Sequence, residues 1–127
     1  MNLNTYAAWQ PTKEIVGRVI VDKIEDSDDG LCIFIHLSKS NKKFRIVFDS
    51  YVAYRNMDES FRNRTFSEHG GFENSLNRVE NSSWLEWLHA ESQGYYTGHD
   101  IAHYAIITDA DCIDVLSEFE PEIMPLD

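Results

Sequence analysis

Lysine and arginine are absent from residues 79–127, so every basic side chain of the 127-residue chain lies in residues 1–78. The chain has 11 basic and 22 acidic residues, and residues 1–78 contain as many acidic as basic ones. The whole formal net charge of −11 therefore falls on residues 79–127. Such a charge repels polyanions and attracts cationic surfaces from beyond contact distance. This composition argues against nucleic-acid binding.

Long hydrophobic runs are also missing from the sequence. The longest, Leu31–Ile35, is far shorter than the roughly 18 apolar residues of a membrane-spanning helix. The chain does not open with the charged and apolar regions of a secretory signal peptide. We therefore expect a cytoplasmic protein without a membrane-spanning segment.

Cysteine is scarce, with only 2 residues, Cys32 and Cys112. Each lies in an apolar run without a second cysteine or a histidine at metal-ligand spacing. The two could pair, but this pattern favours two reduced thiols in the core.

The common catalytic motifs do not occur. The sequence lacks the phosphate-binding glycine loops, the H-E-x-x-H zinc motif, the C-x-x-C redox motif and the G-x-S-x-G nucleophile motif. We therefore predict no catalytic residue, no cofactor and no resident metal.

The first half of the chain has the pattern of strands. With 43% apolar and 13% aromatic residues, residues 1–127 are expected to form a single globular domain. Alternation and apolar runs predict strands at Ile15–Ile24, Leu31–Leu37 and Phe44–Phe48, which the short turns between them would join into an antiparallel meander. Tyr51–Arg55 extends the third strand past a bulge or adds a fourth one.

The second half predicts a loop, a helix and a hairpin. Residues 57–79 are polar and are expected to form a long loop with a helical turn near Phe61. Ser83 and Glu86 fit a capping box, which predicts a helix over residues 84–93. Two further strands are expected at Ala102–Ile107 and Cys112–Leu116.

The predicted fold class is α+β. The three-stranded N-terminal meander and the C-terminal hairpin would form an antiparallel sheet, with one main helix packed on it. Trp84 and Trp87 of that helix are expected to pack into the core as part of an apolar stripe.

One cluster of histidines and carboxylates is a candidate site. His89, Glu91, His99, Asp100 and His103 are ligand types for zinc or another divalent metal, and they could also act as general acids or bases. His99 and His103 flank a predicted boundary between loop and strand, which argues against one shared helical face. Buried, hydrogen-bonded histidines are the alternative explanation.

Exposed acids and tyrosines form the second candidate site. Tyr95 and Tyr96 follow the predicted helix beside acidic residues, where they could anchor a partner or pack down as a lid over the core. The residues predicted to bind a partner are Glu86, Glu91, Tyr95, Tyr96, Asp100, Asp109, Asp111 and Asp114.

Two stretches resemble a family of small acidic bacterial proteins. The first is AYR at residues 53–55 followed by DES at residues 58–60, and the second covers residues 81–120. The second has the family pattern of a Trp-bearing helix, Glu-Ser, Gly and an aromatic, followed by HYAIIT and DCIDVLS. In size and acidity the chain is similar to the immunity proteins of bacterial polymorphic-toxin and contact-dependent inhibition systems.

These observations predict an immunity-type protein that neutralises a cationic toxin domain of the nuclease class through its acidic C-terminal third. One alternative is a small metal-binding or ligand-binding protein, or an enzyme, that uses the histidine cluster. Another is an oligomeric adaptor domain. The acidic region could also serve only to keep the protein soluble.

Overall fold

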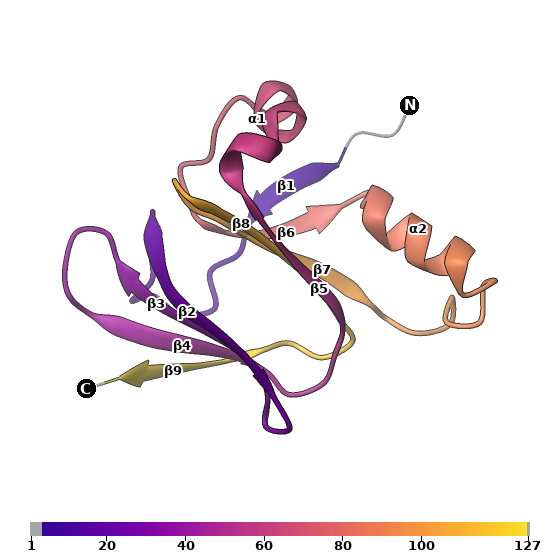
Figure 1. Ribbon diagram of the computed structural model, residues 1–127, viewed down its shortest axis with the longest axis horizontal. Coiled ribbons are helices and arrows are strands. Elements are labelled where there is room, and N and C mark those ends of the chain that lie inside the picture. Colours follow the sequence, from indigo (N-terminus) through magenta and orange to yellow (C-terminus); the bar gives the residue numbers. More distant parts are fainter. Residues whose placement is uncertain (1–3, 127) are drawn as a thin grey trace.

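Two antiparallel sheets make up most of the computed structural model, which describes residues 4–126 (Figure 1). The five-stranded sheet has the order β1 (Thr5–Ala8), β6 (Leu76–Glu80), β7 (Ala102–Ile107), β8 (Asp111–Ser117), β5 (Tyr51–Asp58). The four-stranded sheet has the order β2 (Val19–Ser27), β3 (Gly30–Leu37), β4 (Lys43–Phe48), β9 (Glu122–Leu126). The helical elements are a 3-10 turn at Glu59–Phe61, α1 (Asn63–His69) and α2 (Ser83–Glu91).

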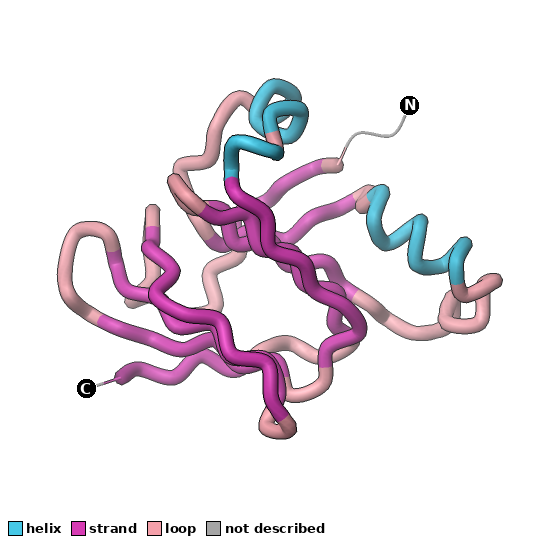
Figure 2. Tube along the Cα trace, in the orientation of Figure 1, coloured by secondary structure: helices cyan, strands magenta, loops and turns pink. Residues whose placement is uncertain are grey.

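The predicted meander and hairpin are both present, but they belong to different sheets. Strands β2, β3 and β4 pair in sequence order, and β7 pairs with β8. The predicted single sheet is therefore wrong. Tyr51 begins a separate strand, β5, which pairs with β8 in the five-stranded sheet. The turn at residues 49–50 thus carries the chain from one sheet to the other (Figure 2).

The predicted long loop over residues 57–79 is also wrong, because this segment contains α1 and most of β6. The helical turn predicted near Phe61 is present as the 3-10 turn. Strand β6 lacks a continuous apolar run, and only Leu76, Asn77 and Val79 are buried in it. It is held by pairing on both sides, with β1 and with β7. Pairing between segments distant in sequence therefore stabilises a strand whose local pattern is polar.

The main core lies between the two sheets. Its buried side chains are Ile15, Val19, Leu31, Ile33, Ile35, Phe44, Ile46, Phe48, Leu76, Tyr104, Ile106, Ile113 and Val115. A smaller cluster joins the opposite faces of β7 and β8 to Phe72 and Val79, with Tyr6 and Phe66 packed against it. Strands β7 and β8 are consequently covered on both faces, so polar side chains on their outer face are also buried.

Both cysteines are free. Cys32 is half-buried on β3, whereas Cys112 is buried on β8. Burial raises the pKa of the Cys112 thiol to about 11, which keeps it protonated and poorly nucleophilic near neutral pH.

Helix α2 differs from the prediction in its cap and in its packing. Ser82, not Ser83, is the N-cap residue, and its Oγ accepts a hydrogen bond from Leu85 N–H. No residue of α2 is buried, and the Trp87 side chain is 52% exposed. The helix projects to one side of the five-stranded sheet (Figure 1), with Trp84 touching the His103 ring at 5.5 Å between centroids. The predicted packing of its tryptophan face on the sheet therefore holds for Trp84, which is half-buried, but is wrong for Trp87.

The helices within residues 4–126 are all too short or too polar to cross a membrane.

The turn between β2 and β3 depends on a glycine. Gly30 has φ +104°, and a Cβ there would lie 2.6 Å from Phe48 O. We expect Gly30→Ala to lower the free energy of unfolding by about 1–3 kcal/mol, because it adds both backbone strain and a clash with main-chain atoms. Urea denaturation followed by circular dichroism measures this.

Gly17→Ala is the matched control for Gly30→Ala. Gly17 has φ +83°, but a Cβ there meets no atom within 4 Å. An equal loss of stability in the two variants would contradict the role of the close approach at Gly30.

Candidate functional site

A buried carboxylate, Asp114, is the centre of an ionic network. Its side chain is 0% exposed. Oδ2 accepts hydrogen bonds from Arg62 Nη1 at 2.6 Å and from Arg55 Nε at 3.0 Å, and Oδ1 lies 2.7 Å from His103 Nε2. We call Asp114, Arg55, Arg62, His103 and Ser82 the Asp114 network. Buried charges require such partners, because burial removes their hydration.

Sheet register brings the members of the network together. Arg55 on β5 lies directly opposite Asp114 on β8. His103 comes from β7, the strand on the other side of β8. Arg62, which is 8% exposed, follows the 3-10 turn and precedes α1. Residues from β5, from the segment before α1 and from β7 thus converge on one carboxylate.

The network keeps Asp114 ionised. Burial alone would raise the pKa of this carboxyl, but the hydrogen bond from His103 and the charges of His103, Arg62 and Arg55 outweigh burial and hold the pKa well below its usual range. Burial likewise acts against the Arg62 charge, yet Asp114 more than offsets this and the pKa of Arg62 is raised.

This depressed pKa predicts acid sensitivity. In the unfolded chain an aspartate has a pKa of about 3.9, above that of folded Asp114. The stabilisation is therefore fully present above this pH and is lost as the pH falls toward the folded-state pKa. We expect the free energy of unfolding, measured by urea denaturation, to decline progressively below about pH 4. The free energy of unfolding of Asp114→Asn should decline less steeply over this pH range. Parallel pH profiles for the two proteins would contradict the assignment of the acid sensitivity to Asp114.

Ser82, His103 and Asp114 form a chain of hydrogen bonds that resembles a catalytic triad. Ser82 Oγ lies 2.6 Å from His103 Nδ1, while the same Oγ accepts the Leu85 N–H that caps α2. A nucleophile must reach its substrate, but Ser82 is buried beneath the start of the helix. The chain of hydrogen bonds therefore anchors the N-terminus of α2 to the five-stranded sheet.

A hollow lined by arginines opens beside the Asp114 network. It has a volume of about 240 Å³ and is lined by Asn4, Arg55, Arg62, Arg64, Thr65, Glu68 and Ser83. We call it the arginine hollow.

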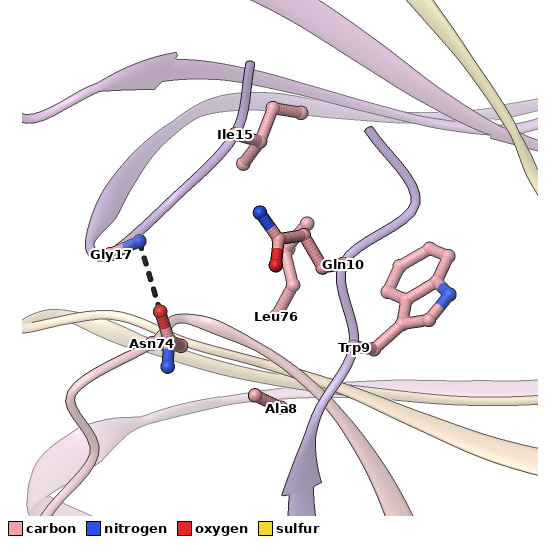
Figure 3. Close-up of a pocket in the computed structure, with 7 residues that line it drawn as sticks. All are labelled: Ala8, Trp9, Gln10, Ile15, Gly17, Asn74 and Leu76. Atoms are coloured by element: carbon pink, nitrogen blue, oxygen red, sulfur yellow. Dashed lines mark hydrogen bonds between the residues drawn. The ribbon is translucent and has the colours of Figure 1, made fainter. Parts of the chain in front are cut away.

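Another hollow, near β1, is much smaller. It has a volume of about 40 Å³ and lies among Trp9, Gln10, Ile15 and their neighbours (Figure 3). Gly17 N–H donates to Asn74 Oδ1 at 3.0 Å on its border. This volume suits water but not an organic ligand.

Tyr95 and Tyr96 lie on the surface rather than over the core. Tyr95 is 78% exposed, and its ring lies 4.9 Å from that of Tyr96. The Tyr96 ring contacts His99 at 5.3 Å, and His99 Nδ1 lies 2.9 Å from Glu118 Oε1. The lid alternative is therefore excluded for Tyr95, and the contacts link both rings to the acidic end of β8.

Carboxylates line a groove next to the two tyrosines, because Glu118 both contacts His99 and belongs to the groove. Asp100, Glu118 and Glu120 line a groove of about 380 Å³ together with Arg78, Ile101, Ala102 and Tyr104. Phe119, between Glu118 and Glu120, is 63% exposed. The acidic aromatic surface is defined here as Tyr95, Tyr96, His99, Asp100, Glu118 and Glu120.

The structure separates the acids that the sequence grouped together. Asp109 and Asp111 lie at the turn between β7 and β8, whereas Asp100 precedes β7 at the other end of the hairpin. Asp109 also pairs with Arg18 at 2.6 Å. Asp114 is buried, so we remove it from the predicted interface.

Glu86 and Glu91 are exposed on α2. Both therefore remain accessible to a partner, on an element next to the acidic aromatic surface.

The histidine cluster does not assemble. His89 is half-buried on α2, His99 is exposed beside Glu118, and both ring nitrogens of His103 face partners in the Asp114 network. Within residues 4–126 no group of three or more histidine, cysteine or acidic side chains could hold a metal ion. The expectation of a buried, hydrogen-bonded histidine is confirmed for His103.

Sequence reasoning missed Arg55, Arg62 and Ser82. Arg55 lies in a predicted strand, Tyr51–Arg55. A basic residue in a strand could have indicated a buried acidic partner. Arg62 lies in a segment with no regular pattern.

Comparisons of the chain with protein-family models, with curated proteins and with solved structures gave no match.

Proposed function

We propose that the protein is an immunity-type binding protein that neutralises a basic partner, a nuclease toxin domain, through the acidic aromatic surface. The observation that carries the proposal is the exposed pair Tyr95 and Tyr96, which His99 links to Glu118. The Glu118 carboxylate lines one groove together with Asp100 and Glu120. Aromatic side chains supply contact area at low entropic cost, and they are enriched among residues that dominate binding energies.

Charge supports a partner that normally binds nucleic acid. A nuclease needs lysine and arginine side chains to hold phosphates. Asp100, Glu118 and Glu120 present carboxylates in one groove, where they can occupy such side chains in place of phosphate. The net charge of −11 would also speed the encounter with a cationic surface.

A capture experiment with three baits tests the proposal. The baits are the wild-type chain, the variant Asp100→Asn/Glu118→Gln/Glu120→Gln, and the control Glu73→Gln/Asp109→Asn/Asp111→Asn, which removes the same charge near the turn between β7 and β8. Each is incubated with lysate of the native cell at low salt, eluted over a salt gradient and analysed by mass spectrometry.

We expect the wild-type and control baits to retain the same basic protein and the first variant to lose it. The retained protein should cleave nucleic acid, and the wild-type chain should inhibit the cleavage. Equal retention by all three baits, or a retained protein with no such activity, would contradict the proposal.

A further inference from the structure

The arginine hollow is a cationic site in an acidic protein. Its lining includes Arg55, Arg62 and Arg64, whereas its only acidic member is Glu68. Arg64 Nε lies 3.4 Å from Glu68 Oε1, and this arginine is otherwise largely exposed. With the buried Asp114 counted as well, the arginines exceed the adjacent carboxylates by one charge.

Arg55 and Arg62 are held in place before any ligand arrives. Arg62 donates through Nη1 to Asp114 and through Nε to Thr65 Oγ1 at 3.2 Å. Within residues 4–126, Arg55 donates a side-chain hydrogen bond through Nε alone, to Asp114. A guanidinium carries five N–H donors, so both retain donors for an anion. Thr65 and Ser83 add hydroxyl groups to the lining.

An aromatic groove continues from the hollow. It has a volume of about 400 Å³ and is lined by Arg55, Ser83, Trp84 and Trp87. Arg55 and Ser83 belong to both linings. The Arg55 guanidinium lies 4.4 Å from the centre of the Trp84 ring, which fixes that ring beside the cationic site.

We propose that this continuous site binds a nucleoside monophosphate. The phosphate would lie in the arginine hollow, where guanidinium and hydroxyl donors match its oxygens. The base would stack on the exposed Trp87 ring, since stacking on an aromatic side chain stabilises any base through its π face. This site is separate from the acidic aromatic surface, and the inference does not depend on the function proposed there.

Binding to the full-length chain is tested at low salt by calorimetry and tryptophan fluorescence. The probes are AMP, inorganic phosphate and adenosine. We expect saturable binding of AMP, weaker binding of phosphate, and quenching of tryptophan fluorescence by AMP. No saturable binding of AMP, or AMP binding no tighter than phosphate, would overturn the proposal.

Substitutions at the rim separate the two halves of the site without disturbing the buried network. Arg64→Ala should weaken the binding of AMP and of phosphate by about tenfold, and Glu68→Gln should strengthen the binding of both. Trp87→Ala should weaken the binding of AMP by about tenfold and leave the binding of phosphate unchanged. Lys13→Ala, which removes a charge from an exposed segment outside the lining, is the control.

Equal weakening by Arg64→Ala and Lys13→Ala would overturn the proposal, because it would show attraction to net charge rather than to a site. An unchanged AMP affinity in Trp87→Ala would overturn the placement of the base. Circular dichroism confirms that each variant remains folded.

Discussion

Asp114→Asn is expected to lower the free energy of unfolding by about 3–5 kcal/mol. The substitution removes the charge that compensates Arg62, a side chain only 9% exposed. Asparagine keeps the shape of the side chain, but it offers one acceptor oxygen where the carboxylate offers two. It would therefore leave Arg62, Arg55 or His103 without its present acceptor in a buried environment.

Urea denaturation of both proteins at neutral pH measures the effect. The matched control is Asp109→Asn, which makes the same chemical change in an exposed ion pair with Arg18. Exposed pairs contribute little to stability, so the control should unfold almost as the wild-type protein does. A similar loss in both variants would mean that the Asp114 network does not stabilise the fold.

The second large effect is expected in association kinetics. Once the basic partner is identified, Asp100→Asn/Glu118→Gln/Glu120→Gln should slow association by about tenfold or more at low salt. The reason is that these carboxylates line one groove, where their fields add along the path of an approaching cationic surface. The same variant should show a flatter dependence of the association rate on ionic strength.

Stopped-flow mixing over a series of salt concentrations measures both quantities. The variant Glu73→Gln/Asp109→Asn/Asp111→Asn carries the same net charge, so it separates local from global electrostatics. We expect its association rate to stay close to the wild-type value. Equal slowing of association in the two variants would mean that net charge alone sets the association rate. The acidic aromatic surface would then not be part of the interface.

Local patterns in the sequence predicted a large part of the secondary structure. Strand β7 has the predicted bounds, Ala102–Ile107, and β8 extends the predicted strand by one residue at each end. Their apolar runs are long because both faces of each strand are covered. The same reasoning failed for β6, where pairing with two distant strands compensates for a polar pattern.

The candidate site was predictable only in part. Tyr95 and Tyr96 are exposed, which agrees with the prediction of an accessible pair and not with that of a lid over the core. The acids at the ends of the β7–β8 hairpin were grouped by their closeness in sequence, but the strands hold them apart. The tryptophans of α2 were expected in the core, yet Trp87 is exposed and Trp84 stacks with Arg55.

The sequence by itself determined the strand runs, the start of α2 to within one residue, and the confinement of all net charge to residues 79–127. These properties depend on composition and on neighbours a few positions away. Only the tertiary structure decided that Asp114 is a buried ion and not a surface contact. Its partners Arg62 and Arg55 are 52 and 59 positions away, and strand register rather than local pattern brings them to it.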